Sequence, residues 1–273
     1  MTRVTIEELI KKLQRDHMPE MEMSQEDIGQ LRAKSYNDAI GDLNERDGYN
    51  CSKCKNKGQI AEYRDGYEMH RLCECQKIRA VLAKAKRSGL GDCLREYRFD
   101  KFETKEEWQA GIKKKAMDFC EDENAKWFYI GGQPGSGKTF LCTAISAHYI
   151  KAGKELRYFM WAEDAKKLKA AVNNYEIYGD LIKEYKEADV LYIDDFLKVR
   201  SGEQPTAADI NLAFELINHR LLSKDKVTII SSEKLIEDLI DYDEATMSRI
   251  YQNTGDYKIS ILPDRKKNFR LHA

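Results

Sequence analysis

Residues 132–139 have the sequence Gly-Gln-Pro-Gly-Ser-Gly-Lys-Thr, a complete G-x-x-x-x-G-K-[ST] phosphate-binding loop, or Walker A motif. Such a loop joins a buried strand to a helix, and the apolar run 127–130 before it supplies the strand. The helix that follows, near 138–151, would point its positive N-terminal end at a bound anion. Strand, loop and helix occur in the required order, so the sequence predicts a nucleoside triphosphate site.

Each residue type in this loop has a chemical role. The glycines let backbone N–H groups close on phosphate oxygens, Lys138 reaches the β- and γ-phosphates, and the Thr139 hydroxyl completes a Mg²⁺ shell. We therefore expect ATP and Mg²⁺ as cofactors. The predicted nucleotide-binding residues are Gly132, Gln133, Pro134, Gly135, Ser136, Gly137, Lys138, Thr139, Phe140 and, from a later strand, Ser232.

A second predicted strand ends in the acidic residues that such a site needs. The apolar run 190–193 is followed by Asp194 and Asp195, which is the Walker B arrangement of P-loop ATPases. Asp194 would hold Mg²⁺ through water, together with Thr139, and Asp195 would orient or deprotonate the attacking water. The alternative is a strand that ends at a solvated acidic turn, which the upstream phosphate loop disfavours.

A third predicted strand, 227–230, ends in Ser231, Ser232 and Glu233. A polar side chain at this point would stand between the two preceding strands and near the γ-phosphate, where it could sense hydrolysis. An N-cap for a helix that begins near Lys234 explains the same residues equally well.

Arg249 stands at the end of a helical stretch further along the chain. If subunits form a ring, this arginine could reach a neighbour's γ-phosphate and offset the charge of the transition state. A surface salt bridge is the competing explanation for a cation at this position.

Four of the seven cysteines form two pairs. Two residues separate Cys51 from Cys54, and one residue separates Cys73 from Cys75. Four thiolates in two such pairs can surround one tetrahedral Zn²⁺, which predicts a small zinc-ribbon-like module. Because the second pair is C-x-C rather than C-x₂-C, His70 is an alternative ligand to Cys73 or Cys75. Free core cysteines or a redox pair are the other interpretations.

The composition fits a globular protein of two units. The chain has 273 residues, with 42% hydrophobic and 34% charged residues, and exceeds one average domain. A formal net charge of -1 excludes a globally basic nucleic-acid coat, so any nucleic-acid site must be a local patch. No run approaches the roughly 20 apolar residues that span a bilayer, and residues 1–8 lack the apolar core of a secretory signal. We expect a cytoplasmic protein without a membrane partner.

The pattern divides the chain into an N-terminal module, 1–88, and an ATP-binding domain, 89–273. Apolar residues at helical spacing predict short amphipathic helices near 6–13 and 28–40, which pack on their own domain or dock on a partner protein. The Ser-Gly-Leu-Gly sequence at 88–91 ends a basic helix and marks the boundary. Strands and helices then alternate, which predicts an α/β fold with a parallel sheet covered by helices.

Together these features resemble the DnaC/DnaI type of replicative helicase loader, a branch of the AAA+ ATPases, and especially its phage and Firmicutes versions. The resemblance covers most of the chain. It includes the cysteine module, the aromatic linker 97–102, the phosphate loop, Asp194-Asp195, Ser231-Ser232, Ser248-Arg249 and the terminal segment 265–270.

This resemblance implies an AAA+ ATPase core behind a small helical and zinc-ribbon-like N-terminal module. It also implies that the N-terminal region binds the hexameric replicative DNA helicase, while the ATPase domain forms homo-oligomers in the ATP state and contacts single-stranded DNA. The resemblance further implies that Arg249 is the arginine finger. Either Ser232 or Glu233 becomes the residue that senses hydrolysis.

The sequence thus predicts an ATPase, slow without partners, that loads the replicative helicase onto single-stranded DNA during replication initiation. One alternative is a transposition helper ATPase of the IstB type, whose partner is a transposase on duplex DNA. Another is an adaptor that binds nucleotide without turnover. The cysteine module argues against the first, and the intact set Lys138, Thr139, Asp194 and Asp195 argues against the second.

Contact with single-stranded DNA calls for a basic groove with aromatic stacking platforms. One candidate is the helix that carries Lys166, Lys167 and Lys169, with Trp161 nearby. The other is the terminal group of Arg265, Lys266, Lys267 and Arg270. A solvated helix face is the ordinary explanation of a run of charge.

Overall fold

The computed structural model describes residues 23–87, 90–200 and 202–271. Contacts within the chain divide it into two compact units, Met1–Gln76 and Lys77–Ala273. The helix predicted near 6–13 lies outside the described residues. So does the predicted boundary between residues 88 and 89, which therefore stays a prediction.

The described part of the first unit consists of two helices, a β-hairpin and the four cysteines. Its elements are α2 (Gln25–Asp38), α3 (Leu43–Asp47), β1 (Gln59–Arg64) and β2 (Tyr67–Leu72), with β1 and β2 antiparallel. A capping box starts α2, because Ser24 and Asp27 each bond the other's backbone N–H. Asn37 fixes α2 to the hairpin, since its amide donates to the Ala61 carbonyl at 2.8 Å and accepts from the Ala61 N–H at 3.0 Å.

Small residues, rather than the predicted apolar ones, form the packing face of α2. Leu31 and Ile40 are exposed, and Ile40 lies beyond the end of the helix, whereas Gly29 and Ala33 are buried. A Cβ added to Gly29 would lie 2.1 Å from the Tyr63 ring. The helix is therefore seated by a close approach of its backbone to an aromatic ring, which hydrophobic periodicity does not reveal.

The second unit is built on a five-stranded parallel sheet. Its strands are β3 (Trp127–Gly132), β4 (Leu156–Met160), β5 (Val190–Asp194), β6 (Val227–Ser232) and β7 (Lys258–Ile261), in the spatial order β4-β5-β6-β3-β7. The predicted parallel sheet is thus confirmed. Because β6 lies between β3 and β5, the phosphate loop and Asp194-Asp195 meet the end of β6 at one edge of the sheet.

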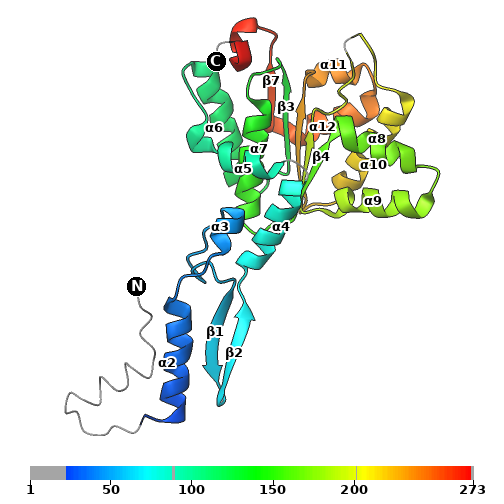
Figure 1. Ribbon diagram of the computed structural model, residues 1–273. Coiled ribbons are helices and arrows are strands. Elements are labelled where there is room, and N and C mark those ends of the chain that lie inside the picture. Colours follow the sequence, from blue (N-terminus) through cyan, green and yellow to red (C-terminus); the bar gives the residue numbers. More distant parts are fainter. Residues whose placement is uncertain (1–22, 88–89, 201, 272–273) are drawn as a thin grey trace. The chain divides into compact units, whose positions relative to one another are not determined.

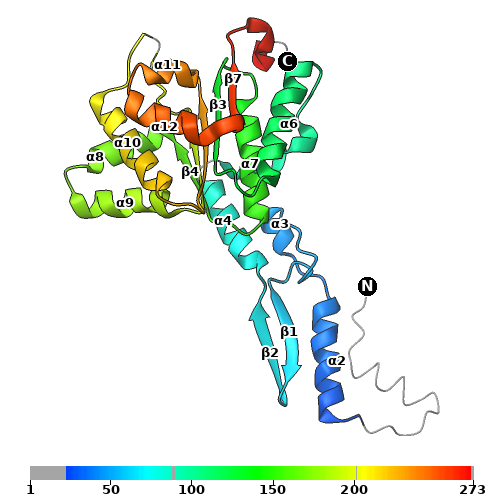
Figure 2. The same ribbon diagram turned by 180° about the vertical axis from the view of Figure 1, so that it is seen from behind.

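Helices cover both faces of this sheet (Figures 1 and 2). Successive residues of β3 face opposite sides. Phe128 meets Phe119 of α6 (Glu107–Glu121), with ring centroids 5.3 Å apart. Tyr129 joins the core beneath the helices from α8 (Trp161–Ala171) to α12 (Glu244–Thr254). None of the helices in the described ranges combines the length and the apolar composition that a bilayer crossing needs.

The α-helices of the second unit are α5 (Leu90–Glu96), α6 (Glu107–Glu121), α7 (Lys138–Lys151), α8 (Trp161–Ala171), α9 (Tyr175–Glu187), α10 (Ala207–Leu221), α11 (Ile236–Ile240) and α12 (Glu244–Thr254). The helix α4 spans Cys75–Arg87, so the division of the chain after Gln76 falls within its first turn. Short 3₁₀ turns complete the fold, namely η1 (Phe99–Lys101), η2 (Gly255–Tyr257), η3 (Arg265–Lys267) and η4 (Phe269–Leu271).

Arg220 of α10 is fully buried and joins several elements of the core. Its guanidinium donates to four carbonyls and one hydroxyl, those of Tyr185, Lys186, Ala188, Val227 and Thr228. Burial lowers the pKa of this group to about 10, so it remains charged at neutral pH. The C-terminal end of α9, with its cap residue Ala188, is thereby hydrogen-bonded to the same side chain as the start of β6.

Replacing Arg220 with methionine should destabilise the second unit strongly, because several buried acceptors would lose their donor at once. We expect Arg220→Met to lower the free energy of unfolding by about 3 kcal/mol or more in urea denaturation followed by circular dichroism. Lys224→Met, at an exposed position just after α10, is the matched control and should stay within about 0.5 kcal/mol of the parent. Equal stability of the two variants would contradict this role of Arg220.

Candidate nucleotide site and cysteine cluster

The phosphate loop lies between β3 and α7, as predicted, in a conformation suited to anions. Gly132, Gly135 and Gly137 have φ values of 107°, 73° and 88°, in the left-handed region that favours glycine. Gly137 is the N-cap of α7, and the Ser136 hydroxyl closes the loop by donating to the Gln133 carbonyl at 2.8 Å. The loop is therefore a formed cradle at a helix N-terminus, which is where phosphates bind.

Lys138 is buried inside this cradle. Its ammonium donates to the carbonyls of Gly132 and Gln133, each at 2.8 Å. Burial lowers the pKa of Lys138, and the nearby carboxylates of Glu233 and Asp195 act in the opposite direction. An ammonium has three donor hydrogens, so a third can reach a phosphate oxygen while the two loop contacts hold the side chain in place.

A cavity of about 670 Å³ lies in front of the loop, within the roughly 300–1,000 Å³ typical of small-molecule sites. The cavity brings together most of the predicted site. Predicted residues on its wall are Pro134, Gly135, Gly137, Lys138, Thr139, Phe140 and Asp195. The aromatic linker also contributes, since Tyr97 stacks on Phe140 at 4.6 Å between ring centroids and Phe102 lies edge-on to it at 5.3 Å.

Asp194, at the end of β5, is only 7% exposed and is surrounded by hydroxyl groups. It accepts from Tyr192 at 2.7 Å, Tyr158 at 2.9 Å and Thr139 at 3.3 Å, and also from Ser231. Burial raises the pKa of both tyrosines, so they remain donors. Thr139 and Asp194 thus lie together, and their oxygens are the kind of ligand that Mg²⁺ prefers, so the donor set fits the expected ion.

Asp195, the next residue, lines the cavity and pairs with Lys198, a residue that the sequence did not single out. The Lys198 ammonium lies 2.8 Å from Asp195 Oδ2 and 2.9 Å from Glu233 Oε1. Asp195 has a left-handed backbone, with φ of 54°, and its N–H donates to Ser231 Oγ at 3.1 Å. Such a backbone costs a non-glycine residue about 1 kcal/mol or more, and here it accompanies a carboxylate at the cavity wall.

The two candidates for the hydrolysis-sensing residue lie in different places. Ser232 is buried, and its hydroxyl donates to the Phe196 carbonyl at 2.9 Å and accepts from the Lys234 N–H at 3.2 Å. These bonds stabilise the turn before α11, which begins at Ile236. Glu233, in contrast, lines the cavity. Sequence reasoning did not assign a role to the Ser231 hydroxyl, which contacts both Walker B residues.

Arg249 is exposed on α12 and is not among the residues that line the cavity of its own chain. Its guanidinium donates to the Asn218 side chain and lies 6.0 Å from the centroid of the Phe214 ring. Any contact with a γ-phosphate would therefore involve another copy of the protein, and the arginine-finger role stays a prediction.

The stacking role predicted for Trp161 is wrong, because this side chain is only 2% exposed and packs edge-on against Phe196 at 5.0 Å. The basic residues near it are partly occupied as well. Lys169 pairs with Asp209 at 2.6 Å, and Lys167 pairs with Asp164 at 2.8 Å. These lysines therefore belong to an ordinary solvated helix face.

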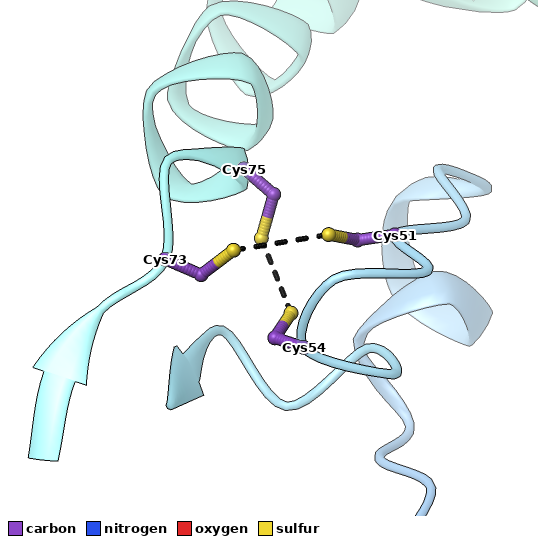
Figure 3. Close-up of side chains that lie close together, drawn as sticks. All are labelled: Cys51, Cys54, Cys73 and Cys75. Carbon is purple, nitrogen blue, oxygen red and sulfur yellow. Dashed lines mark hydrogen bonds between the residues drawn. The ribbon is translucent and has the colours of Figure 1, made fainter. Parts of the chain in front are cut away.

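The four predicted cysteines do converge in the first unit (Figure 3). The sulfur atoms of Cys51 and Cys73 are 3.8 Å apart, those of Cys54 and Cys75 are 3.5 Å apart, and all four lie within 4.8 Å of one another. Four thiolates at about 2.3 Å from a tetrahedral Zn²⁺ would be about 3.8 Å apart. All four are free of disulfides, so this donor set fits a zinc ion.

The pKa values of two thiols in the cluster are shifted in opposite directions. Burial raises the pKa of Cys54, but the Gly58 N–H at 3.2 Å from its sulfur and the neighbouring thiols outweigh this and bring it to about 7. Burial raises the pKa of Cys73. The alternative ligand, His70, is exposed on β2, where it pairs with Glu68 at 3.1 Å and lies edge-on to Tyr36. Four sulfurs already complete a tetrahedral set, so this alternative is not supported.

Purified protein should contain about one zinc ion per chain, and Cys54→Ser or Cys73→Ser should lose it, because three thiolates bind the ion less tightly than four. Metal content by mass spectrometry and the thermal unfolding curve would be measured for each variant. The midpoint temperature of thermal unfolding should fall together with the zinc content. Cys120→Ser, outside the cluster, is the control and should keep its zinc. Parent zinc content in Cys54→Ser would contradict the assignment.

Comparison with known proteins supports the assignment of a nucleotide site. The family model of the IstB-like ATP binding protein matches residues 69–248. The phage-like element PBSX protein XkdC of Bacillus subtilis (strain 168) is 29% identical over 96% of this chain and 94% of its own length. The replicative helicase loader DnaC of Buchnera aphidicola is 25% identical over 58% of this chain and 63% of that protein.

A solved structure agrees with the fold. The crystal structure of DnaI superposes with a TM-score of 0.50, covering 63% of this chain and 92% of that one, at 17% identity, which shows the fold alone. The family match includes both the phosphate loop and Asp194-Asp195. The chain therefore belongs to the family of the IstB-like ATP binding protein, and its second unit has an AAA+ P-loop fold.

Proposed function

We propose that this protein is an ATP-dependent loader that places the replicative DNA helicase on single-stranded DNA during replication initiation. The observation that carries the proposal is the combination, in one chain, of the four-cysteine module and a complete ATP site of the IstB/DnaC family. The similarity to a helicase loader, the Buchnera DnaC protein, supports it.

In the ATPase unit, the loop N–H groups and Lys138 would bind and orient the phosphates of ATP. Thr139 and Asp194 would hold Mg²⁺, which supplies charge neutralisation on the phosphates when bound. Asp195 would orient the attacking water or accept its proton. In a single chain this carboxylate is paired with Lys198, which supports slow turnover by the isolated protein.

Assembly would complete the site. The exposed position of Arg249, away from the cavity of its own chain, supports a role in a neighbouring copy, where it would offset charge on the γ-phosphate. ATP would then favour a homo-oligomer that holds the helicase open around single-stranded DNA. Hydrolysis would remove that preference and release the loader.

The N-terminal module would dock on the helicase. Three large apolar side chains of β2 are exposed in the described structure, with Tyr67 at 75%, Met69 at 49% and Leu72 at 68%. Tyr67 and Met69 are two residues apart and so share one face of the hairpin, where a pair of exposed apolar side chains would suit a surface that a partner protein covers. The cysteine cluster would keep the hairpin rigid enough to present them.

A transposition helper ATPase of the IstB type is the second candidate, because the matching family model is named after IstB. Its partner would be a transposase on duplex DNA. An adaptor that binds nucleotide without turnover is the third. Partner and turnover measurements separate the three functions.

Turnover is tested by two substitutions with different expected effects. Lys138→Ala should abolish ATP binding, because the loop loses its buried cation. Asp195→Asn should bind ATP normally but hydrolyse it about 100-fold more slowly, which is a typical loss for a general base. Phosphate release would be measured with and without helicase and single-stranded DNA. If the parent protein shows no turnover with any partner, the adaptor function is favoured instead.

Loading is tested by native mass spectrometry of the protein mixed with the replicative helicase of its host. We expect a complex of one helicase hexamer with several loader copies, with a composition that changes on addition of ATP and fails to change in Lys138→Ala. A parent protein that ignores the helicase but assembles with ATP on duplex DNA would overturn the loader function in favour of the transposition helper.

A further inference from the structure

The two oxygens of Asp194 have different sets of donors. Oδ1 accepts from Tyr192 at 2.7 Å, from Thr139 at 3.3 Å and from Ser231. Oδ2 accepts from Tyr158 at 2.9 Å, and no other described residue donates to that oxygen. The proposed magnesium site accounts for the contact with Thr139, but it does not account for the two tyrosines.

The register of the strands brings both tyrosines to Asp194. Tyr192 stands two residues before Asp194 on β5, so the two side chains lie on the same face of the sheet. Tyr158 belongs to β4, at one end of the strand order, and is the register partner of Tyr192, with ring centroids 5.2 Å apart. From this diagonal position an aromatic side chain can reach the residue two places further along the neighbouring strand. Tyr158 thus reaches the acidic end of β5 from another strand.

The hydroxyl of each tyrosine is what distinguishes it here from a phenylalanine, which would fill nearly the same space. A buried hydroxyl without a partner is unfavourable, and so is a buried carboxylate without donors. Phenolic hydroxyls are protonated at neutral pH and can donate to a carboxylate. Tyr158 and Tyr192 therefore supply donors that the buried Asp194 needs, and the position of each donor decides what else it does.

The contact at Oδ2 fixes the orientation of the carboxylate. Rotation about the bond to an aspartate carboxyl group is soft, so donors on Oδ1 alone would leave Oδ2 free to swing. With Tyr158 on Oδ2, both ends of the carboxylate are held. The Thr139 hydroxyl can then give its hydrogen to Oδ1 while its lone pairs stay available to a cation. Because Mg²⁺ requires nearly ideal octahedral geometry, the orientation of these oxygens should set its affinity.

We propose that Tyr158 is a positioning residue of the magnesium site, whose hydroxyl holds Asp194 in the orientation in which Asp194 and Thr139 receive Mg²⁺ together. This inference rests on the proposed ATP and magnesium site and adds a residue of β4 to it. Tyr158 is not among the residues that line the cavity, so it acts through Asp194 rather than on the nucleotide.

The experiment measures how Mg²⁺ affects the binding of a fluorescent, non-hydrolysable ATP analogue to the full-length protein. Tyr158→Phe keeps the ring and removes only the hydroxyl. The Mg²⁺ concentration that gives half of the full effect should rise about tenfold, a typical loss for a residue that orients a metal ligand. Affinity for the analogue in EDTA should equal that of the parent. Parent Mg²⁺ dependence in Tyr158→Phe would overturn the inference.

Two other tyrosines provide comparisons. The Tyr257 hydroxyl also donates to an aspartate at 2.9 Å, but to Asp122, so Tyr257→Phe is the matched control and should keep the parent Mg²⁺ dependence. Tyr192→Phe removes one donor from Oδ1, which keeps two others, so its effect should be smaller than that of Tyr158→Phe. Equal losses in Tyr192→Phe and Tyr158→Phe would contradict a particular role for the contact at Oδ2.

A direct reading of the metal separates positioning from a merely structural role. Oxygen ligands suit Mn²⁺ as they suit Mg²⁺, so Mn²⁺ bound in the presence of the analogue can be measured by electron paramagnetic resonance. Tyr158→Phe should bind Mn²⁺ about tenfold more weakly. Its hydrolysis rate should return close to that of the parent at saturating Mg²⁺, because the metal affinity changes and the reacting groups do not. A lower thermal stability with parent Mn²⁺ affinity would show a structural role alone and would overturn the inference.

The outcomes separate failure of this inference from failure of the proposed site. If Lys138→Ala binds the analogue as well as the parent does, the ATP site itself is wrong. If the parent binds the analogue equally well in Mg²⁺ and in EDTA and takes up no Mn²⁺, the magnesium site is wrong. If the parent depends on Mg²⁺ and Tyr158→Phe depends on it equally, only the role of Tyr158 fails. Because the helicase is absent from these measurements, no outcome depends on the loader function.

Discussion

The nucleotide site depends on the position of β6 between β3 and β5. Parallel strands bring their carboxyl ends to one edge, so the phosphate loop after β3 and the acids after β5 meet there. Ser231 joins them, because its hydroxyl donates to Asp194 and accepts from the Asp195 N–H. A slip of β6 by one residue would turn Ser231 to the opposite face, and both Walker B residues would lose this support.

Charge at the cavity is distributed among elements far apart in sequence. Lys198 lies between Asp195 and Glu233, so each of these carboxylates already has a cation before any nucleotide enters. Lys138 is held by loop carbonyls, and burial lowers its pKa. Among the described residues, few charged groups on the cavity wall are therefore without a partner in the protein. On the function proposed here, the positions of these charged groups determine which copy of the protein contributes each contact with ATP.

Local motifs were predictable because covalent spacing alone brings their residues together. The eight residues of the phosphate loop form one turn between a strand and a helix, and each cysteine pair lies within a short stretch of chain. Other features could not be predicted from the sequence. Gly29 and Ala33 seat α2 but carry almost no hydrophobic signal, and Trp161 resembled a surface platform although it is buried. Burial and small-residue packing depend on the neighbours that the fold supplies.

The phosphate loop, the acidic end of β5 and the cysteine pairs can be recognised in the sequence alone, because each is a chemical pattern within a few residues. Which distant groups contact these motifs depends instead on the fold. Strand order placed Ser231 against Asp194, the turn after β5 brought Lys198 to Glu233, and the path of the chain after β7 returned Phe269 to the phosphate loop. Such contacts arise from packing between remote segments, and periodicity along the chain does not contain that information.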